Sequence, residues 1–381
     1  YQQRSPFRDY FHWAIMPTVD AAPQNPQWIN TYMSADSVFA YSEFGRDTMI
    51  EQCDNMNFID VASPAASEKF APYEDKGKHK SSMGLSEDSV IVGTVMRNQR
   101  RKLYPDLFKS FRRILDETQN SNLFLFCHTY YPDIGWEIPQ LLNQTNLNNR
   151  VLFTYRCKKC GALHVDFFTD SVSHCSTCGQ FSRQMVGIDN SIDEEQLNKV
   201  YNLFDIYVQY ANSEGFGVKN INGFGIKPVQ YSMEAETGCY RAVPDNDKFV
   251  ELMCDLLKDK DSLRQKGLQT AVTARQHYSW DKTAQIWLER IRSIPIRDEK
   301  ETWLSAPKIF EPAKSIPADR LDIVDKINFL FTNVLHKPEW IGNYLWCKIL
   351  KDCTFNYRMH NSSEDFYFNE SHIQNMDRYQ P

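Results

Sequence analysis

The clearest hydrophobic pattern in the chain is a repeated pairing of a short apolar run with an amphipathic stretch, beginning near residue 86. Val90–Val95 is apolar except for one glycine and one threonine, as in a strand that is buried on both faces. Apolar residues then recur at helical spacing from Leu107 to Leu115, with Pro105 in the first turn, where proline is tolerated. The pattern predicts a β-strand followed by a helix that packs against it.

The same rhythm continues toward residue 210. We expect three further strands and two further helices, in the order Leu123–Cys127, Trp136–Leu142, Val151–Phe153, a helix from the Ser191–Glu194 capping box through Phe204, and Ile206–Tyr210. Strands that alternate with helices in this way favour a parallel sheet with helices on both faces. The expected fold class is therefore α/β, with a doubly wound, Rossmann-like parallel sheet.

The first 85 residues follow a different pattern. Short strand-like runs occur at Ser37–Tyr41 and Phe58–Val61, among aromatic residues and polar turns. The charged stretch Glu74–Lys80 that follows is typical of a linker. We therefore separate a segment of residues 1–85 from an α/β domain of residues 86–295.

The strand–helix rhythm is lost after Gly217. Residues 218–230 contain asparagine, glycine and proline where a helical repeat would continue. Three helices are expected next, at residues 248–258, 262–276 and 281–292. A proline-rich passage then leads to an apolar helical segment at residues 321–335. Residues 296–381 are thus expected to form a helical C-terminal extension.

Composition and charge narrow the classes of partner. The 381 residues carry a net charge of -6 and are 13% aromatic, so they can form two or three cores but create no positive field that attracts nucleic acid. The longest apolar runs, such as Leu123–Cys127, are too short to span a bilayer. Six of the ten cysteines are scattered singly. This scatter suits a reducing compartment and predicts a cytoplasmic protein.

Four cysteines form the strongest local signal in the chain. Cys157 and Cys160, then Cys175 and Cys178, are two C-x2-C pairs with the spacing of a structural zinc ribbon. Four thiolates fill a tetrahedral site and leave no open position, so the predicted zinc is structural. The alternative is four unrelated buried cysteines, which the glycine after each pair disfavours. His174 is a candidate substitute ligand but is better explained as a bystander.

Two loops carry candidate binding residues. Arg97 and Lys102 follow the first predicted strand of the α/β domain, where open α/β sheets bind their ligands, and cations beside a helix N-terminus suit a diphosphate. The alternative for this stretch is a solvated basic turn. Ser213–Gly217 follows the fourth predicted strand in the same topological place, although taken alone this glycine motif is better explained as a simple turn.

Five segments follow one another along the chain: the Arg97-x4-Lys102 turn, Asp133–Glu137, Asn149–Phe153, Ser213–Gly217 and His277–Asp281. Together they resemble the donor-binding half of retaining glycosyltransferases of the GT-B fold, of the group 1 type. The likeness covers roughly residues 86–295, and its specificity comes from the order and spacing of the five segments.

Two other parts of the chain bear on the same likeness. The runs Ala35–Ser42 and Val61–Pro72 resemble the last strands of that family's acceptor domain, so residues 1–85 are expected to be its C-terminal remnant. The zinc ribbon, residues 155–182, is outside the general family pattern. It is similar to an insertion of phage-type or viral-type relatives.

The resemblance implies a hexosyltransferase that takes a sugar from a nucleotide-diphosphate donor and gives it to an unknown acceptor. It implies that Arg97 and Lys102 hold the diphosphate and stabilise the leaving group. Glu214 matches a catalytic glutamate near the donor sugar. The residues that shape the loop beside it are Gly215, Phe216 and Gly217. Because cationic side chains replace a divalent metal in this family, no catalytic metal is expected.

The chain also departs from the family pattern. Asn222 stands where a second glutamate that binds the ribose is expected, and the helix and strand that should follow are missing, as after an internal deletion. Measured against the same pattern, we also expect an N-terminal truncation that removes most of the acceptor domain before Tyr1. We therefore expect this chain to turn over poorly or not at all.

The alternative is a non-catalytic nucleotide-binding or nucleic-acid-binding protein with a zinc ribbon. Its support is a basic cluster made of Arg97, Arg100, Arg101, Lys102, Lys109, Arg112 and Arg113. Four members lie in the turn that the resemblance assigns to the diphosphate, and the whole chain is acidic. Nucleic acid is therefore not an expected partner.

Overall fold

The computed structural model describes residues 11–213, 223–235, 237–294, 356–358 and 365–367. Two compact units are distinguished, Tyr1–Pro295 and Ile296–Pro381. In the second unit the described residues form an antiparallel hairpin of β13 (Asn356–Arg358) and β14 (Asp365–Tyr367). The helix predicted at residues 321–335 lies outside the described residues.

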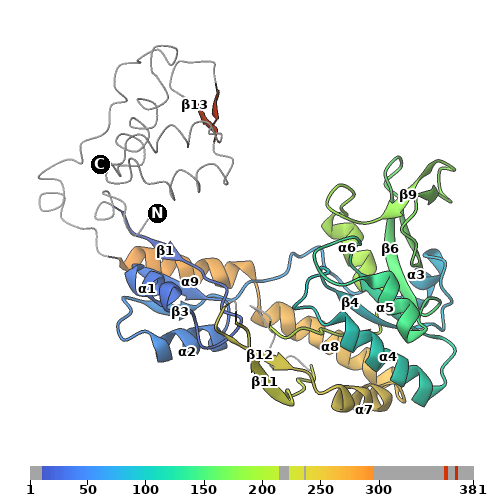
Figure 1. Ribbon diagram of the computed structural model, residues 1–381, viewed down its shortest axis with the longest axis horizontal. Helices are drawn as coiled ribbons and strands as arrows, with labels where there is room; N and C mark the ends of the chain where they lie inside the picture. Colours follow the sequence, from blue (N-terminus) through green and yellow to red (C-terminus); the bar gives the residue numbers. More distant parts are fainter. Residues whose placement is uncertain (1–10, 214–222, 236, 295–355, 359–364, 368–381) are drawn as a thin grey trace, which may run out of the picture. The chain divides into compact units, whose positions relative to one another are not determined.

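A parallel sheet forms the centre of the α/β domain within the first unit (Figure 1). Its strands are β4 (Val90–Val95), β5 (Leu123–His128), β6 (Val151–Cys157) and β10 (Ile206–Tyr207), in the order β10-β4-β5-β6. All four strands were predicted. A helix connects β4 to β5 and β5 to β6, and a longer segment with three strands and a helix connects β6 to β10. The prediction of an α/β fold with a doubly wound parallel sheet is confirmed.

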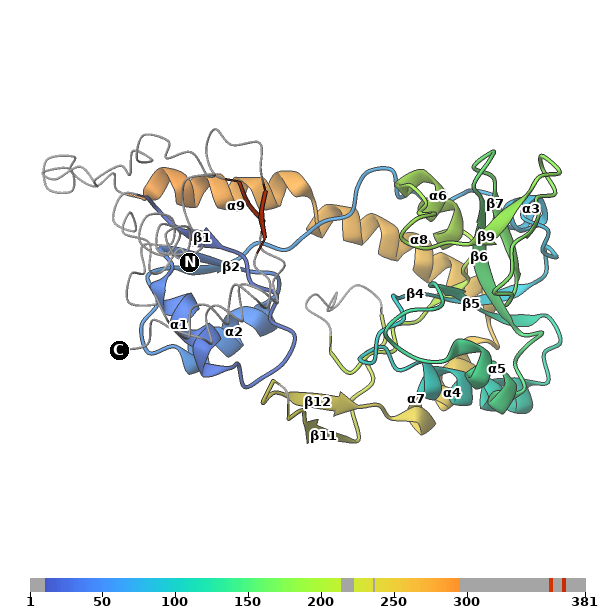
Figure 2. The same ribbon diagram turned by 45° about the horizontal axis from the view of Figure 1, so that its top comes forward.

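Helices cover both faces of this sheet. α4 (Tyr104–Thr118), α5 (Ile138–Thr145) and α7 (Asn246–Leu256) pack on one face, and α6 (Glu194–Tyr201) packs on the other (Figure 2). Side chains of a strand point to alternate faces, so Val90 and Val92 of β4 belong to the α4 core whereas Ile91 belongs to the α6 core. This two-sided burial explains why the strand is apolar at successive positions.

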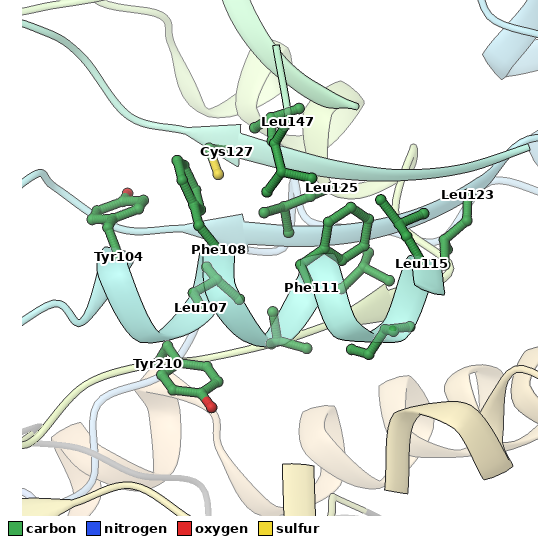
Figure 3. Packing of buried hydrophobic residues seen from close by; sticks show 14 of the residues in the cluster. Tyr104, Leu107, Phe108, Phe111, Leu115, Leu123, Leu125, Cys127, Leu147 and Tyr210 are labelled. Atoms are coloured by element: carbon green, nitrogen blue, oxygen red, sulfur yellow. The ribbon is translucent and has the colours of Figure 1, made fainter. Parts of the chain in front are cut away.

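Helix α4 supplies the largest part of the core (Figure 3). Its apolar face, which includes Leu107, Phe108 and Phe111, lies against Leu125 and Cys127 of β5. Each of these side chains is at most 1% exposed, and full burial of one such side chain contributes about 1.5–3 kcal/mol. The position of α4 on the sheet is therefore strongly fixed.

Strand β10 is shorter than predicted. It ends at Tyr207, although the backbone N–H of Val208 still donates to the carbonyl of Gly93 at 2.8 Å. The carbonyl of Tyr210 instead accepts a hydrogen bond from the backbone N–H of Leu103 at 3.1 Å. The chain leaves the ladder because it bonds to the turn that precedes α4.

The prediction of a linker at Glu74–Lys80 is wrong in part, because most of these residues belong to helix α3 (Lys76–Ser82). The side chain of Asp75 caps this helix by accepting from the N–H of Lys78. The ammonium group of Lys80, which is buried, donates to Asp205 at 2.7 Å and to the carbonyl of Ser89 at 2.7 Å. The sequence indicated a linker, but the carboxylate of Asp205, which is distant in sequence, holds this helix to the α/β domain through Lys80.

Two other boundaries differ from the predictions. Helix α6 begins after Asp193, whose side chain accepts from the N–H of Gln196, so the N-cap is not Ser191. After residue 223 the chain forms an antiparallel hairpin of β11 (Gln230–Met233) and β12 (Tyr240–Val243). Within the described residues this hairpin does not join the parallel sheet.

A second, smaller parallel sheet lies near the start of the chain. Its strands are β1 (Ala14–Ile15), β2 (Ser37–Ala40) and β3 (Ile59–Val61), and its connecting helices are α1 (Pro26–Ser34) and α2 (Glu43–Gln52). The strands predicted at residues 37–41 and 58–61 are thus confirmed.

Helix α9 (Trp280–Ser293) packs on this small sheet (Figure 1). The helix before it in sequence, α8 (Lys260–His277), lies beside the α/β domain. The indole of Trp287 stacks on the ring of Phe39 with centroids 4.2 Å apart. The Arg290 guanidinium donates to Ser37 Oγ at 2.8 Å. The end of the α/β segment therefore returns to the first sheet.

The segment predicted as a zinc ribbon, residues 155–182, is called the cysteine module below, and its strands extend the main sheet beyond β6. Strand β6 runs on to Cys157, four residues further than predicted, and pairs antiparallel with β7 (Leu163–Phe167) and β9 (Phe181–Met185). β9 pairs in turn with β8 (Ser173–His174). The module is therefore held to the domain by backbone hydrogen bonds and not only by its two chain connections.

We predict that Gly93→Ala lowers the free energy of unfolding by about 2–3 kcal/mol, in the upper part of the range for overpacked cores. A Cβ at this position of β4 would lie 2.1 Å from Cγ of the Phe204 ring. Gly267→Ala is the matched control, because that Cβ would have no neighbour within 4 Å and α8 would gain up to about 1 kcal/mol. Urea unfolding curves of the two variants measure both effects. Equal midpoints would contradict the packing of Phe204, which follows α6, on β4.

Candidate functional site and metal centre

Three loops meet at the carboxyl end of the parallel sheet. They are the β4–α4 turn (residues 96–103), the β5–α5 loop (residues 129–137) and the segment after β10 (residues 208–213). The indole N–H of Trp136 donates to the carbonyl of Lys102 at 2.7 Å, and the N–H of Asn212 donates to the carbonyl of Arg101 at 3.1 Å. The β4–α4 turn is thus bonded to both of the other loops.

Asn98 joins the first two loops most tightly. Its side-chain amide accepts from the N–H of Trp136 at 2.8 Å and donates to the carbonyl of the same residue at 2.8 Å. A Cβ at Gly135 would lie 2.3 Å from Asn98 Oδ1 and 2.5 Å from the Asn98 backbone, so only glycine permits this approach. The Arg100 guanidinium covers the Trp136 ring at 4.7 Å. Sequence reasoning missed Asn98, for which the Gly-Trp pair was the only signal.

Arg97 is held by an acidic partner. Its Nε and Nη2 donate to the two carboxylate oxygens of Asp133 at 2.9 and 3.0 Å. The Asp133 side chain is 1% exposed, whereas that of Arg97 is 50% exposed. The hydrogen bonds from Arg97 lower the pKa of the Asp133 carboxyl, and the same bonds raise the pKa of the guanidinium. Arg97 is therefore a cation at the sheet edge that is both oriented and accessible.

Lys102 lies in the same turn but is only 5% exposed. It forms a backbone bridge with Ala211, and α4 begins two residues later at Tyr104. The Tyr104 hydroxyl donates to the carbonyl of Met96 at 2.7 Å and closes the turn from inside. The structure thus places Arg97 and Lys102 on the same turn with different exposure, and the contact of each with a ligand stays a prediction.

The glycine loop after β10 is described only in part. Ser213 is buried, and its Oγ has no hydrogen-bond partner within the described residues; the same is true of Asn212 Oδ1 and of Thr94 Oγ1 in β4. Buried polar atoms without a partner are rare, and a ligand or a water at this edge would satisfy them. The other predicted residues of the loop lie outside the described residues; they are Glu214, Gly215, Phe216, Gly217 and Asn222.

A cavity of about 530 Å³ lies beside this loop region. Its walls come from β10 and the residues after it, from residues 223–228 and from helices α7 and α8. Apolar side chains such as Val208, Phe249 and Leu263 form much of the lining. Arg97 and Lys102 are not among its lining residues, so the cavity and the candidate cations are separate features.

The four predicted metal ligands converge. The Sγ atoms of Cys157, Cys160, Cys175 and Cys178 all lie within 4.8 Å of one another, and the 157–178 and 160–175 pairs are both 3.7 Å apart. Tetrahedral zinc with Zn–S bonds of about 2.3 Å requires sulfur atoms about 3.8 Å apart, so the thiolates fit this metal.

The two halves of the metal centre have the same backbone geometry. Gly161 and Gly179 follow the second cysteine of each pair with φ of 76° and 71°. Their N–H groups donate to the carbonyls of Cys157 at 2.9 Å and of Cys175 at 2.8 Å. A residue with a side chain is strained at such φ values, which explains the glycine at both positions.

One histidine beside the metal centre was not foreseen. His164 Nε2 lies 3.2 Å from Cys175 Sγ, whereas His174 Nδ1 contacts the carbonyl of Gly179 at 3.1 Å. His164 is therefore the imidazole next to a ligand sulfur, in place of the His174 considered from sequence. His164 lies only four residues after Cys160, but strand β7 brings it to Cys175 of the second pair, which the cysteine spacing did not indicate.

Solved structures with a similar arrangement were found. Sucrose-phosphate synthase from Thermosynechococcus elongatus matches 74% of this chain and 67% of its own, with a TM-score of 0.52 and 16% identity. HepE from Anabaena in complex with UDP matches 76% of this chain and 74% of its own, with a TM-score of 0.52 and 11% identity. The fold is that of the GT-B glycosyltransferases.

Two sequence comparisons gave no match: no protein-family model fits the chain, and no curated protein matches it. The likeness is thus visible in the fold and not in overall sequence. Among the described residues, no helix combines the length and the apolar character needed to cross a bilayer.

We predict one tightly bound zinc ion per chain. Substitution of both Cys157 and Cys175 by serine should abolish it, because two of four thiolate ligands are lost. Cys254→Ser is the matched control, since this cysteine lies on α7 outside the cluster, and it should leave the zinc content unchanged. Metal analysis of purified protein measures all three. A wild-type zinc content near zero would contradict the assignment.

We also predict a loss of stability in mild acid that depends on His128. Burial lowers the pKa of this imidazole, at the end of β5, to about 4. Its ordinary pKa is about 6.5, so the unfolded chain takes up a proton before the folded one does. Stability is therefore complete above pH 6.5 and falls by about 3 kcal/mol as the pH drops to 4.

The variant His128→Gln should flatten this part of the pH profile, because it cannot be protonated in that range. His12→Gln, at an exposed position, is the control and should keep the wild-type slope. Urea unfolding at several pH values between 4 and 7 measures the difference. An unchanged slope in His128→Gln would show that other groups cause the acid sensitivity.

Proposed function

We propose that this chain transfers a sugar from a nucleotide-diphosphate donor, which binds at the carboxyl end of the β4–β5–β6 sheet. The observation that carries the proposal is the half-exposed guanidinium of Arg97, fixed at this edge of a GT-B fold. The HepE structure of the same fold is a complex with UDP. No feature of the described residues at this edge specifies the acceptor.

The chemistry of such a transfer suits the charges at this edge. Cleavage of the sugar–phosphate bond leaves negative charge on the departing diphosphate, and preorganised donors stabilise that charge. Arg97 and Lys102 supply two cations, and α4 points its N-terminus toward the same turn, where its partial positive charge adds to theirs. We propose that Glu214 acts beside the donor sugar and that the anomeric configuration is retained.

We propose zinc in the cysteine site and assign it no catalytic part. The four thiolates complete a tetrahedral coordination shell, so no position remains for a substrate oxygen. Cys157 is the last residue of β6 and pairs with Arg183 of β9, so the cysteine site is part of the extended sheet. Zinc bound there would stabilise the extension of the sheet, whereas the diphosphate would be bound by side chains of the protein.

The alternative of nucleic-acid binding is not favoured by the basic cluster. Arg112 is paired with Asp116 at 2.6 Å, and Arg113 is paired with Asp247 at 2.6 Å. Arg97 is paired with Asp133. Carboxylates of the described residues thus offset at least three of the seven cations, and a surface that binds the phosphate backbone needs several unopposed cations.

Nucleoside diphosphate binding tests the proposal. We expect at least one of ADP, CDP, GDP, TDP and UDP to raise the melting temperature of the protein, because a ligand that binds only the folded state stabilises it. Arg97→Ala should weaken that binding about 10- to 100-fold, the equivalent of a lost hydrogen bond to a charged group. Binding of the corresponding nucleoside should change little.

The matched control is Arg112→Ala, which removes an arginine of the same domain from an exposed ion pair on α4. It should leave diphosphate binding unchanged. If Arg97→Ala weakened the nucleoside and the diphosphate equally, the effect would act through the fold, and the proposed diphosphate contact would be wrong.

We further expect slow release of nucleotide from nucleotide sugars. Asn222 replaces a carboxylate that would bind the ribose through charge-assisted hydrogen bonds, which are roughly twice as strong as neutral ones. Turnover should thus remain below about 1 per second, the lower end of ordinary enzyme rates. A coupled assay of nucleotide release measures it, and faster release would show that the missing carboxylate is compensated.

A further inference from the structure

We propose that Asp133 is a positioning residue for the donor diphosphate. Its carboxylate holds the guanidinium of Arg97 in one orientation, so that the edge of Arg97 not bound to Asp133 is presented to the ligand. The inference rests on the proposed function, because it concerns the same diphosphate site. It adds a residue that makes no contact with the donor itself.

The first observation is the unequal exposure of the two partners. Asp133 is covered almost completely, at 1% exposure, whereas half of the Arg97 side chain remains exposed. A covered carboxylate is costly unless a charged partner satisfies it, and Arg97 meets both of its oxygens. The pair therefore has a fixed acidic side and an accessible basic side.

The second observation is the set of donors that the pair uses. A guanidinium carries five N–H donors in one rigid plane. Asp133 accepts from Nε and from Nη2 of Arg97. The Nη1 group lies on the edge of the plane that the carboxylate does not occupy. Since a bidentate pair fixes the whole plane, Asp133 also fixes the direction in which Nη1 points.

The third observation is that Asp133 is itself held in place. Its Oδ1 accepts from the backbone N–H of Ile134 at 2.8 Å. On one side of the loop, Asn98 bonds to the backbone of Trp136 at two points. On the other side, the ring of Tyr131 contacts the ring of Phe168, beyond β7, with centroids 5.8 Å apart. The carboxylate is thus a rigid support.

A preorganised arginine loses less conformational entropy when it binds a phosphate oxygen. The carboxylate also lowers the net charge of the site, which would weaken the attraction for a diphosphate. These two effects have opposite signs, and the positioning role requires that orientation outweighs charge. Substitution of Asp133 by a neutral residue of the same size separates them.

The experiment uses the full chain and the nucleoside diphosphate that binds the wild-type protein most tightly among ADP, CDP, GDP, TDP and UDP. Dissociation constants are measured by calorimetry for the wild-type protein, Asp133→Asn, Arg97→Ala and the double variant. We expect Asp133→Asn to weaken binding about tenfold, less than Arg97→Ala does. In the double variant, Asp133→Asn should add less than about twofold, because no arginine is left to orient.

Asp116→Asn is the matched control. Asp116 accepts a bidentate pair from Arg112, with the same pair of arginine nitrogens, but on the exposed face of α4. This variant should bind the diphosphate as the wild-type protein does. Melting temperatures and zinc contents of all variants report on folding, and binding of the nucleoside alone should not change in Asp133→Asn.

Each outcome decides the matter. Tighter binding by Asp133→Asn would show that the carboxylate competes with the ligand, and additive losses in the double variant would show that Asp133 acts independently of Arg97. Either result overturns the positioning role while leaving the proposed function intact. Failure of the wild-type protein to bind all five nucleoside diphosphates would overturn the proposed function, and the positioning role with it.

Discussion

The packing of α4 against β4 and β5 is the constraint on which the rest of the α/β domain depends. Phe108 and Phe111 are buried between the helix and the sheet, so the axis of α4 is fixed relative to the strand before it. The Tyr104 hydroxyl at the start of the helix donates to the carbonyl of Met96, the first residue after the strand. The turn between them has little freedom, and the candidate cations are placed on that turn.

The candidate site is an assembly of loops that support one another. The β4–α4 turn bonds to the β5–α5 loop through Asn98 and to the segment after β10 through Leu103. Parallel strands bring the carboxyl ends of neighbouring strands to one edge, so residues distant in sequence meet there. Arg97 remains accessible at this edge because the turn is held by Asn98 and its neighbouring loops, and Asp133 binds only one edge of the guanidinium.

The cysteine module has a different physical basis. Its thiolates lie at the spacing that a tetrahedral metal requires, and glycines with positive φ form both turns. Strand β6 connects it to the sheet, since the same strand pairs with β5 at its start and with β9 at its end. The four cysteines that could hold a metal and the sheet hydrogen bonds thus belong to one continuous element.

The sequence by itself determined the elements whose signals are local. Continuous apolar runs identified β4 and β5, helical periodicity identified α4, and cysteine spacing identified the cluster that could hold a metal, because each pattern depends on burial or coordination within a short segment. Arg97 and Lys102 were marked by their place between a predicted strand and a predicted helix, and by the family likeness.

Only the tertiary structure decided the partners of these residues. The pairing of Arg97 with Asp133, the contact of His164 with Cys175 and the anchoring of Lys80 by Asp205 join residues from different elements. The linker predicted at residues 74–80 was wrong in part for the same reason. Such contacts depend on the register and order of strands, which no local pattern encodes.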